Sequence, residues 1–114
     1  METTALIPIV AEKLDAVHAL CRRFGVRRLE IFGSGAIGGF RPESSDLDFI
    51  VDFGDQPLGP WGKLFLDFAD GMEALFSRHI DLIMPGSIRN PYFRQAVDAS
   101  RRVIYEARSE KAAL

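Results

Sequence analysis

The chain has 114 residues, of which 47% are hydrophobic, and its 14 basic and 16 acidic side chains give a formal charge of −2. This length and composition can bury a real core, which excludes a largely disordered protein and favours a single domain over residues 1–108. The near-neutral charge argues against a protein that binds nucleic acid mainly by neutralising phosphates, and no stretch approaches the ~20 apolar residues of a membrane span. We therefore expect no membrane association, no stable nucleic-acid binding and a cytoplasmic location.

The first third of the chain predicts a helix and then a strand. Apolar residues in 8–24 recur at the spacing of one helix face, and Gly25 is a typical helix end. Cys21 lies within this pattern and is expected to be a small buried thiol. Residues 26–32 alternate apolar and charged side chains and run into Gly33-Ser34-Gly35, which indicates a strand that leads into a tight loop.

The middle of the chain predicts two further strands with a helix between them. Residues 47–53 alternate strictly between apolar and mostly acidic positions, as a strand with one buried face does. A loop rich in Gly and Pro follows over 55–62, and the apolar spacing of 64–78 predicts a second amphipathic helix. Alternation returns over 79–84 and indicates a third strand.

The last third predicts one more helix. Asn90-Pro91 is a helix-start signature, because Asn can cap the first free amides and Pro tolerates the first helical position. The helix is expected over 91–101. Residues 103–105 are prone to β structure and either add an edge strand or continue the helix. Residues 109–114 are expected to form a flexible tail.

Asp46 and Asp48 are the first candidates for chemistry. Side chains at positions i and i+2 of a strand point to the same face, so the two carboxylates lie side by side. Like charges this close favour a cation between them, and hard oxygen ligands suit Mg²⁺. The alternative is a solvated acidic turn, which Glu43-Ser44-Ser45 in front of the pair also fits.

The Gly33-Ser34-Gly35 loop is the second candidate. Glycines let the backbone approach an anion, and consecutive amides with a hydroxyl can donate hydrogen bonds to a phosphate. Such a loop can also serve only to reverse the chain. The order of strand, Gly-Ser loop and acidic strand nevertheless combines a phosphate cradle with a metal site, and a nucleoside triphosphate with Mg²⁺ needs both.

The segment Phe32-Gly33-Ser34, followed after eleven residues by Asp46-Leu47-Asp48-Phe49, resembles the signature of the DNA polymerase beta-like nucleotidyltransferase superfamily. The chain is most similar to its minimal nucleotidyltransferase (MNT) branch, whose members are also this short and often end with a stretch like residues 85–94. The resemblance implies an α/β nucleotidyltransferase fold with a small, mixed, twisted sheet and helices packed mainly on one face. It also implies that Gly33 and Ser34 bind the phosphates of ATP.

The same resemblance implies that Asp46 and Asp48 coordinate two Mg²⁺ ions and that a third acid on a neighbouring strand completes the catalytic site. Asp81 is the candidate, because it lies within the predicted strand 79–84. His79 shares its face and is expected either to assist or to be an ordinary surface histidine. Asp52 continues the face of Asp46 and Asp48 and is expected to be exposed or near the metals.

One position departs from the family pattern. Relatives often have arginine three residues after the serine of the Gly-Ser pair, where this chain has Ile37. If that arginine assists phosphate binding, activity here is weakened or the substrate is altered. Arg41, four residues later, is a candidate to replace it.

The resemblance implies that the chain transfers AMP from ATP to a hydroxyl, that of a tyrosine, on a partner HEPN ribonuclease toxin and so acts as an antitoxin in a hetero-oligomer. Two alternatives remain open at this stage. The chain neutralises its toxin by binding alone, which Ile37 favours, or it transfers a nucleotidyl group to a small molecule or RNA. The near-neutral charge counts against RNA.

Overall fold

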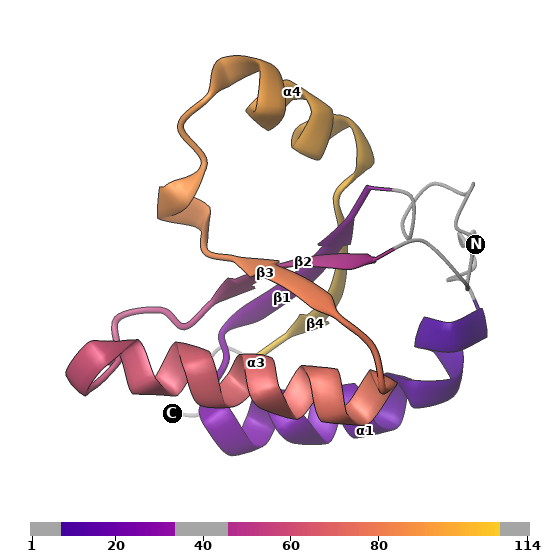
Figure 1. Ribbon diagram of the computed structural model, residues 1–114, viewed down its shortest axis with the longest axis vertical. Helices are drawn as coiled ribbons and strands as arrows, with labels where there is room; N and C mark the ends of the chain where they lie inside the picture. The colour runs from indigo at the N-terminus through magenta and orange to yellow at the C-terminus, as the bar shows by residue number, and fades with distance from the viewer. Residues whose placement is uncertain (1–7, 34–45, 108–114) are drawn as a thin grey trace.

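The computed structural model describes residues 8–33 and 46–107, which form helices and strands in mixed order (Figure 1). The elements are α1 (Pro8–Phe24), β1 (Arg28–Phe32), β2 (Leu47–Asp52), the 3₁₀ turn η1 (Pro60–Gly62), α3 (Lys63–Phe76), β3 (Ile80–Ile83), the 3₁₀ turn η2 (Pro85–Ser87), α4 (Pro91–Ser100) and β4 (Arg102–Glu106). The predicted tail over 109–114 lies outside the described residues.

The strands form one sheet in the order β3-β2-β1-β4. β1 pairs with β2 and with β4 in antiparallel orientation, whereas β2 and β3 run parallel. A parallel pair needs a long crossover, and α3 supplies it between β2 and β3. The sheet is therefore mixed, as the sequence predicts.

The main core lies between one face of the sheet and the pair α1 and α3. Leu29 and Ile31 of β1 and Phe49 of β2 are fully buried there, facing Val17 of α1 and Phe68 of α3. Figure 1 shows the two helices side by side beneath the sheet. Burying a side chain of this size stabilises the fold by about 1.5–3 kcal/mol, so this layer explains why the alternating apolar positions face the helices.

The opposite face of the sheet is covered only in part. α4 lies across it, on the far side from α1 and α3 (Figure 1). A smaller core cluster joins Phe32 of β1 and Ile50 of β2 to Ile88 and Val97. Because Asp48 alternates with the buried Leu47 and Phe49, its side chain points to this second, partly covered face.

Several predicted ends shift by one or two residues. α3 ends at Phe76 rather than near Arg78, because Ser77 adopts a left-handed conformation with φ 55° that stops the helix. α1 ends where predicted, and Gly25 follows with φ 68°. Strand β1 starts at Arg28, two residues later than the predicted strand.

The structure settles the open alternative for residues 103–105, which lie within the edge strand β4. The pairing of β4 with β1 shifts register between Leu29 and Glu30, so the strand carries a bulge. Within 8–33 and 46–107, no helix is long and apolar enough to cross a membrane.

Candidate active site

Three carboxylates predicted from the sequence lie close together at one end of the parallel pair. Asp48 of β2 lies opposite Asp81 of β3 in the strand register. Asp46 precedes Asp48 by two residues and belongs with Asp81 to a group whose ligand atoms all lie within 4.8 Å of one another. Asp46 and Asp81 are exposed, whereas Asp48 is partly buried. The structure therefore brings together the three acids on one face of the sheet.

Gly33 lies directly beside this cluster. Phe32 at the end of β1 pairs with Asp48 across the antiparallel ladder, so the next residue passes close to the Asp48 carboxylate. A Cβ atom on Gly33 would lie 2.8 Å from Asp48 Oδ2, and Gly33 has φ +75°. The left-handed backbone favours glycine at this position, and an added Cβ atom would also force the Asp48 carboxylate to shift.

The site carries an excess of negative charge. Burial, a hydrogen bond with Asp81 and the charges of Asp81 and Asp46 together raise the pKa of Asp48 to about 6, and burial is the largest cause. A carboxyl group that is desolvated next to two other carboxylates holds its proton more tightly than in water. The site therefore favours a cation, which removes the repulsion.

His79 lies directly before β3 and belongs to the same group as Asp46 and Asp81. Its Nε2 lies 3.1 Å from Asp81 Oδ1, and its Nδ1 lies 3.5 Å from Glu73 Oε2 of α3. The hydrogen bond with Asp81 is the main cause that raises the pKa of His79. The side chain is 61% exposed, so His79 is a surface histidine and also a member of the acidic cluster.

These residues fit a divalent metal ion. Asp46, Asp81 and His79 each offer a ligand atom within one small volume. Asp48 adds a carboxyl group whose pKa is raised by burial and by its acidic neighbours, so a bound cation would favour its ionised form. Carboxylate oxygens are the ligands that Mg²⁺ prefers. The arrangement is able to hold the metal of a phosphoryl-transfer site.

The remaining predicted positions are either outside the described residues or away from the acidic cluster. Ser34, Ile37 and Arg41 lie outside the described residues. Asp52, at the far end of β2, accepts a hydrogen bond from the Gly54 amide at 2.8 Å and so fixes the turn after the strand. Asp52 is therefore a turn residue with no part in the acidic cluster.

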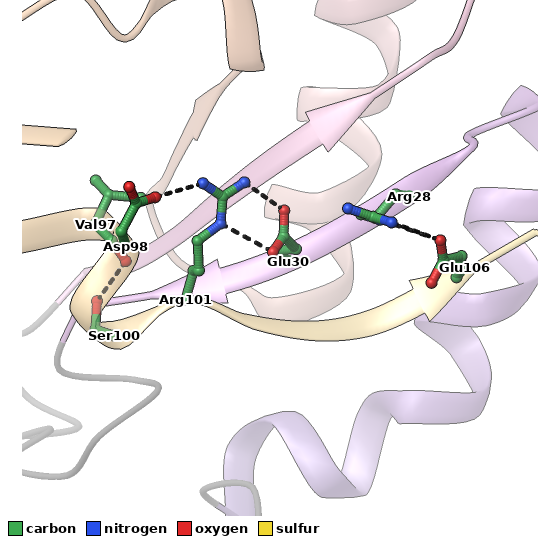
Figure 2. A network of polar contacts seen from close by, with 7 residues as sticks. All are labelled: Arg28, Glu30, Val97, Asp98, Ser100, Arg101 and Glu106. Atoms are coloured by element: carbon green, nitrogen blue, oxygen red, sulfur yellow. Dashed lines mark hydrogen bonds and ion pairs between the residues drawn. The ribbon is translucent and has the colours of Figure 1, made fainter. Parts of the chain in front are cut away.

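A polar network that holds the Gly33 backbone and the end of α4 was not predicted from the sequence. The Gly33 amide donates a hydrogen bond to Ser100 Oγ at 2.9 Å. The next residue, Arg101, binds the buried carboxylate of Glu30 on β1 (Figure 2). Only the polarity of Glu30 in a strand with buried neighbours could have signalled a partner, and nothing local to Ser100 indicates that it reaches Gly33.

The sequence of the chain is similar to those of known proteins. A family model described as a nucleotidyltransferase domain matches residues 15–105. The chain is also 34% identical over 86 residues to the protein adenylyltransferase MntA of Thermococcus cleftensis, a match that covers 75% of this chain and 80% of that protein.

Solved structures agree with the family match. One described as a minimal nucleotidyltransferase is 27% identical, has a TM-score of 0.67 and covers 89% of this chain and 98% of its own. A structure of the tri-AMPylated HEPN toxin of Shewanella oneidensis in complex with MNT antitoxin matches with a TM-score of 0.58 at 14% identity, covering 90% of this chain and 77% of that one. At that identity the likeness establishes a shared fold.

Proposed function

Because the chain belongs to the nucleotidyltransferase domain family, we propose that it transfers AMP from ATP to a tyrosine hydroxyl of a partner HEPN ribonuclease toxin and thereby acts as a cytoplasmic antitoxin. The observation that carries the proposal is the convergence of Asp48 with Asp46 and Asp81 beside the backbone of Gly33. This arrangement joins a metal site to the start of the Gly-Ser segment, as transfer from a nucleoside triphosphate requires.

Each residue of the cluster has a distinct part in the proposed reaction. Asp46 and Asp48, at the start of β2, would hold two Mg²⁺ ions, and Asp81 would share one of them. When bound, the ions neutralise charge that develops on the phosphates and lower the pKa of the attacking hydroxyl. Gly33 and Ser34 position the terminal phosphates, since orientation of the reacting groups contributes much of the rate.

The proposed chemistry is an in-line displacement at the α-phosphorus of ATP. A bond forms between the acceptor oxygen and the α-phosphorus, while the bond from that phosphorus to the oxygen bridging to the β-phosphate breaks. Pyrophosphate leaves with the electron pair of the broken bond. The proton of the acceptor hydroxyl passes to Asp81, which acts as general base.

The identity of the acceptor is supported by relatives rather than by the site itself. The Thermococcus cleftensis relative is a protein adenylyltransferase, and the structural relative from Shewanella oneidensis is an MNT antitoxin bound to an AMPylated HEPN toxin. The described part of this chain is nearly filled by the sheet and its helices, with no separate acceptor domain. A partner protein that supplies the acceptor, in a hetero-oligomer, fits both observations.

Labelled transfer tests the proposal. The chain is incubated with its co-purified partner, Mg²⁺ and ATP labelled at the α-phosphate, and the label is followed onto protein by gel and mass spectrometry. We expect a tyrosine of the partner to gain AMP and Asp48→Ala to abolish transfer, because one metal ligand is lost. Asp52→Asn is the matched control from the same strand and should retain transfer, since Asp52 holds only the turn at Gly54.

Neutralisation by binding alone is the second candidate, and the isoleucine at position 37 favours it. It predicts no labelled product with the wild type and full protection from the toxin by Asp48→Ala. Label that appears on RNA or on a small molecule, with none on the partner, would contradict both readings and point to a different acceptor.

A further inference from the structure

A residue at the end of α4 forms a hydrogen bond with the backbone amide of Gly33. We propose that Ser100 is a positioning residue of the nucleotide site, whose hydroxyl fixes Gly33 at the distance from Asp48 that the bound triphosphate requires. The inference rests on the proposed function, because it assigns to Ser100 the alignment of the site that would bind ATP. Ser100 acts through the backbone of Gly33, to which its hydroxyl is hydrogen-bonded.

The direction of the hydrogen bonds shows what Ser100 does. The Gly33 amide donates to Ser100 Oγ at 2.9 Å, so the hydroxyl oxygen is the acceptor. The hydroxyl proton is in turn directed to the carbonyl groups of Ala96 and Val97, at 3.2 and 3.3 Å. Ser100 is 6% exposed, so water does not readily replace it. The helix therefore orients the hydroxyl, and the hydroxyl orients Gly33.

The position of Gly33 matters because the space around it is limiting. The point where a Cβ atom would stand is 2.8 Å from Asp48 Oδ2, so the Gly33 backbone lies closer to the carboxylate than a residue with a Cβ allows without a shift. The bond to Ser100 occupies the Gly33 amide, so Ser100 fixes the orientation of the Gly33 backbone beside Asp48.

Ser100 is itself held firmly by its neighbours. Arg101 Nε and Nη2 donate to the two carboxylate oxygens of Glu30 at 3.0 and 2.8 Å, and Nη1 donates to Asp98 at 2.7 Å (Figure 2). Glu30 lies on the strand that ends at Phe32, and Phe32 packs in one cluster with Val97 of α4. These contacts attach the end of α4 to the strand that leads into Gly33.

Three substitutions at one position test the inference. Ser100→Ala removes the acceptor, Ser100→Cys keeps the volume but accepts only weakly, and Ser100→Thr restores a hydroxyl. Ser87→Ala is the matched control, because the Ser87 hydroxyl donates to a backbone carbonyl of its own turn, Met84 O at 2.7 Å, and is exposed. Circular dichroism establishes the temperature range in which every variant is folded.

Two readouts on the folded chain report positioning. Hydrogen exchange of the Gly33 amide, measured by NMR, should be about tenfold faster in Ser100→Ala, the factor expected for one lost hydrogen bond. The Kd for AMP-PNP in the presence of Mg²⁺, measured by calorimetry, should rise about tenfold, because fewer molecules hold the competent backbone before binding. Ser100→Thr should match the wild type, Ser100→Cys should be intermediate, and Ser87→Ala should be unchanged.

Steady-state transfer to the partner separates positioning from catalysis. We expect Ser100→Ala to raise the KM for ATP about tenfold and to change kcat by less than about threefold, because the bound state regains the aligned backbone. A wild-type Kd and Gly33 exchange rate in folded Ser100→Ala, or in Ser100→Cys if the alanine variant does not fold, would overturn this inference alone. A wild-type chain that binds no AMP-PNP with Mg²⁺ would overturn the proposed function as well.

Discussion

At the scale of single residues, ionisation of Asp48 in the acidic cluster lowers the stability of the fold. The pKa of Asp48 is raised to about 6 by burial and by its two acidic neighbours, so ionisation of this carboxyl is less favourable in the folded chain than in the unfolded one. Below the pKa of the unfolded chain the group is protonated in both states and costs nothing. The penalty grows as the pH rises and is complete above the folded pKa.

We therefore expect Asp48→Asn to stabilise the metal-free protein at pH 8, where the wild-type carboxyl is ionised. After allowance for solvent screening the gain is about 1 kcal/mol, or about 4 °C in Tm. Thermal unfolding in EDTA at pH 8 and at pH 4 measures it, and the gain should shrink at pH 4. Asp52→Asn, at the other end of β2, should show no such pH-dependent gain. An unchanged or lower Tm for Asp48→Asn at pH 8 would contradict the expectation.

At the scale of elements, the end of α4 is attached to β1 by an ion pair whose carboxylate is buried, unlike an exposed pair nearby. Glu30 is 6% exposed and receives two hydrogen bonds from Arg101. Arg28 and Glu106 also join neighbouring strands at 2.7 Å, but both side chains are about half exposed (Figure 2). Removal of one partner from a buried pair leaves an uncompensated charge, whereas an exposed pair contributes little.

Arg101→Ala should accordingly destabilise the chain by about 3 kcal/mol, and Arg28→Ala by less than about 1 kcal/mol. Urea unfolding of both variants measures the difference. Adding Glu30→Gln to Arg101→Ala should recover part of the loss, because the buried carboxylate is then neutral. Equal losses for the two arginine variants would show that burial of Glu30 does not govern the energetics of this attachment.

At the scale of the whole molecule, the two faces of the sheet differ in how much they bury. The face toward α1 and α3 carries the large cluster, whereas α4 contributes only Val97 and Ser100 as buried residues. Segments with few buried contacts open at lower free energy than the main core. α4, the helix whose Ser100 holds Gly33, is thus the least firmly packed of the described α-helices.

We expect the amides of α4 to exchange through a local opening, at a free energy below that of global unfolding, while amides of β1 and β2 exchange only with global unfolding. Native-state hydrogen exchange at increasing denaturant measures both. Arg101→Ala should lower the opening free energy of α4 more than that of the central strands, because the lost ion pair attaches this helix. Identical exchange free energies in α4 and β1 would contradict the expected order.

The local features of this protein could be predicted from the order of its residues. Alternation over β2 predicted that Asp46 and Asp48 share the face away from the core, because side chains in a strand alternate with period two. The Asn90-Pro91 signature predicted the start of α4, where Asn90 Oδ1 accepts hydrogen bonds from the amides of Tyr92 and Phe93 at 2.8 and 3.2 Å. Such features depend on neighbouring residues only.

Contacts between residues far apart in the chain became visible only in the folded structure. The parallel register places Asp81 opposite Asp48, where the sequence offered Asp81 only as an acid on another strand. The bond between Gly33 and Ser100 joins residues 67 positions apart, and that between Glu30 and Arg101 spans 71. The last two contacts follow from how α4 packs across the sheet, and packing is set by the whole core rather than by any local pattern of residues.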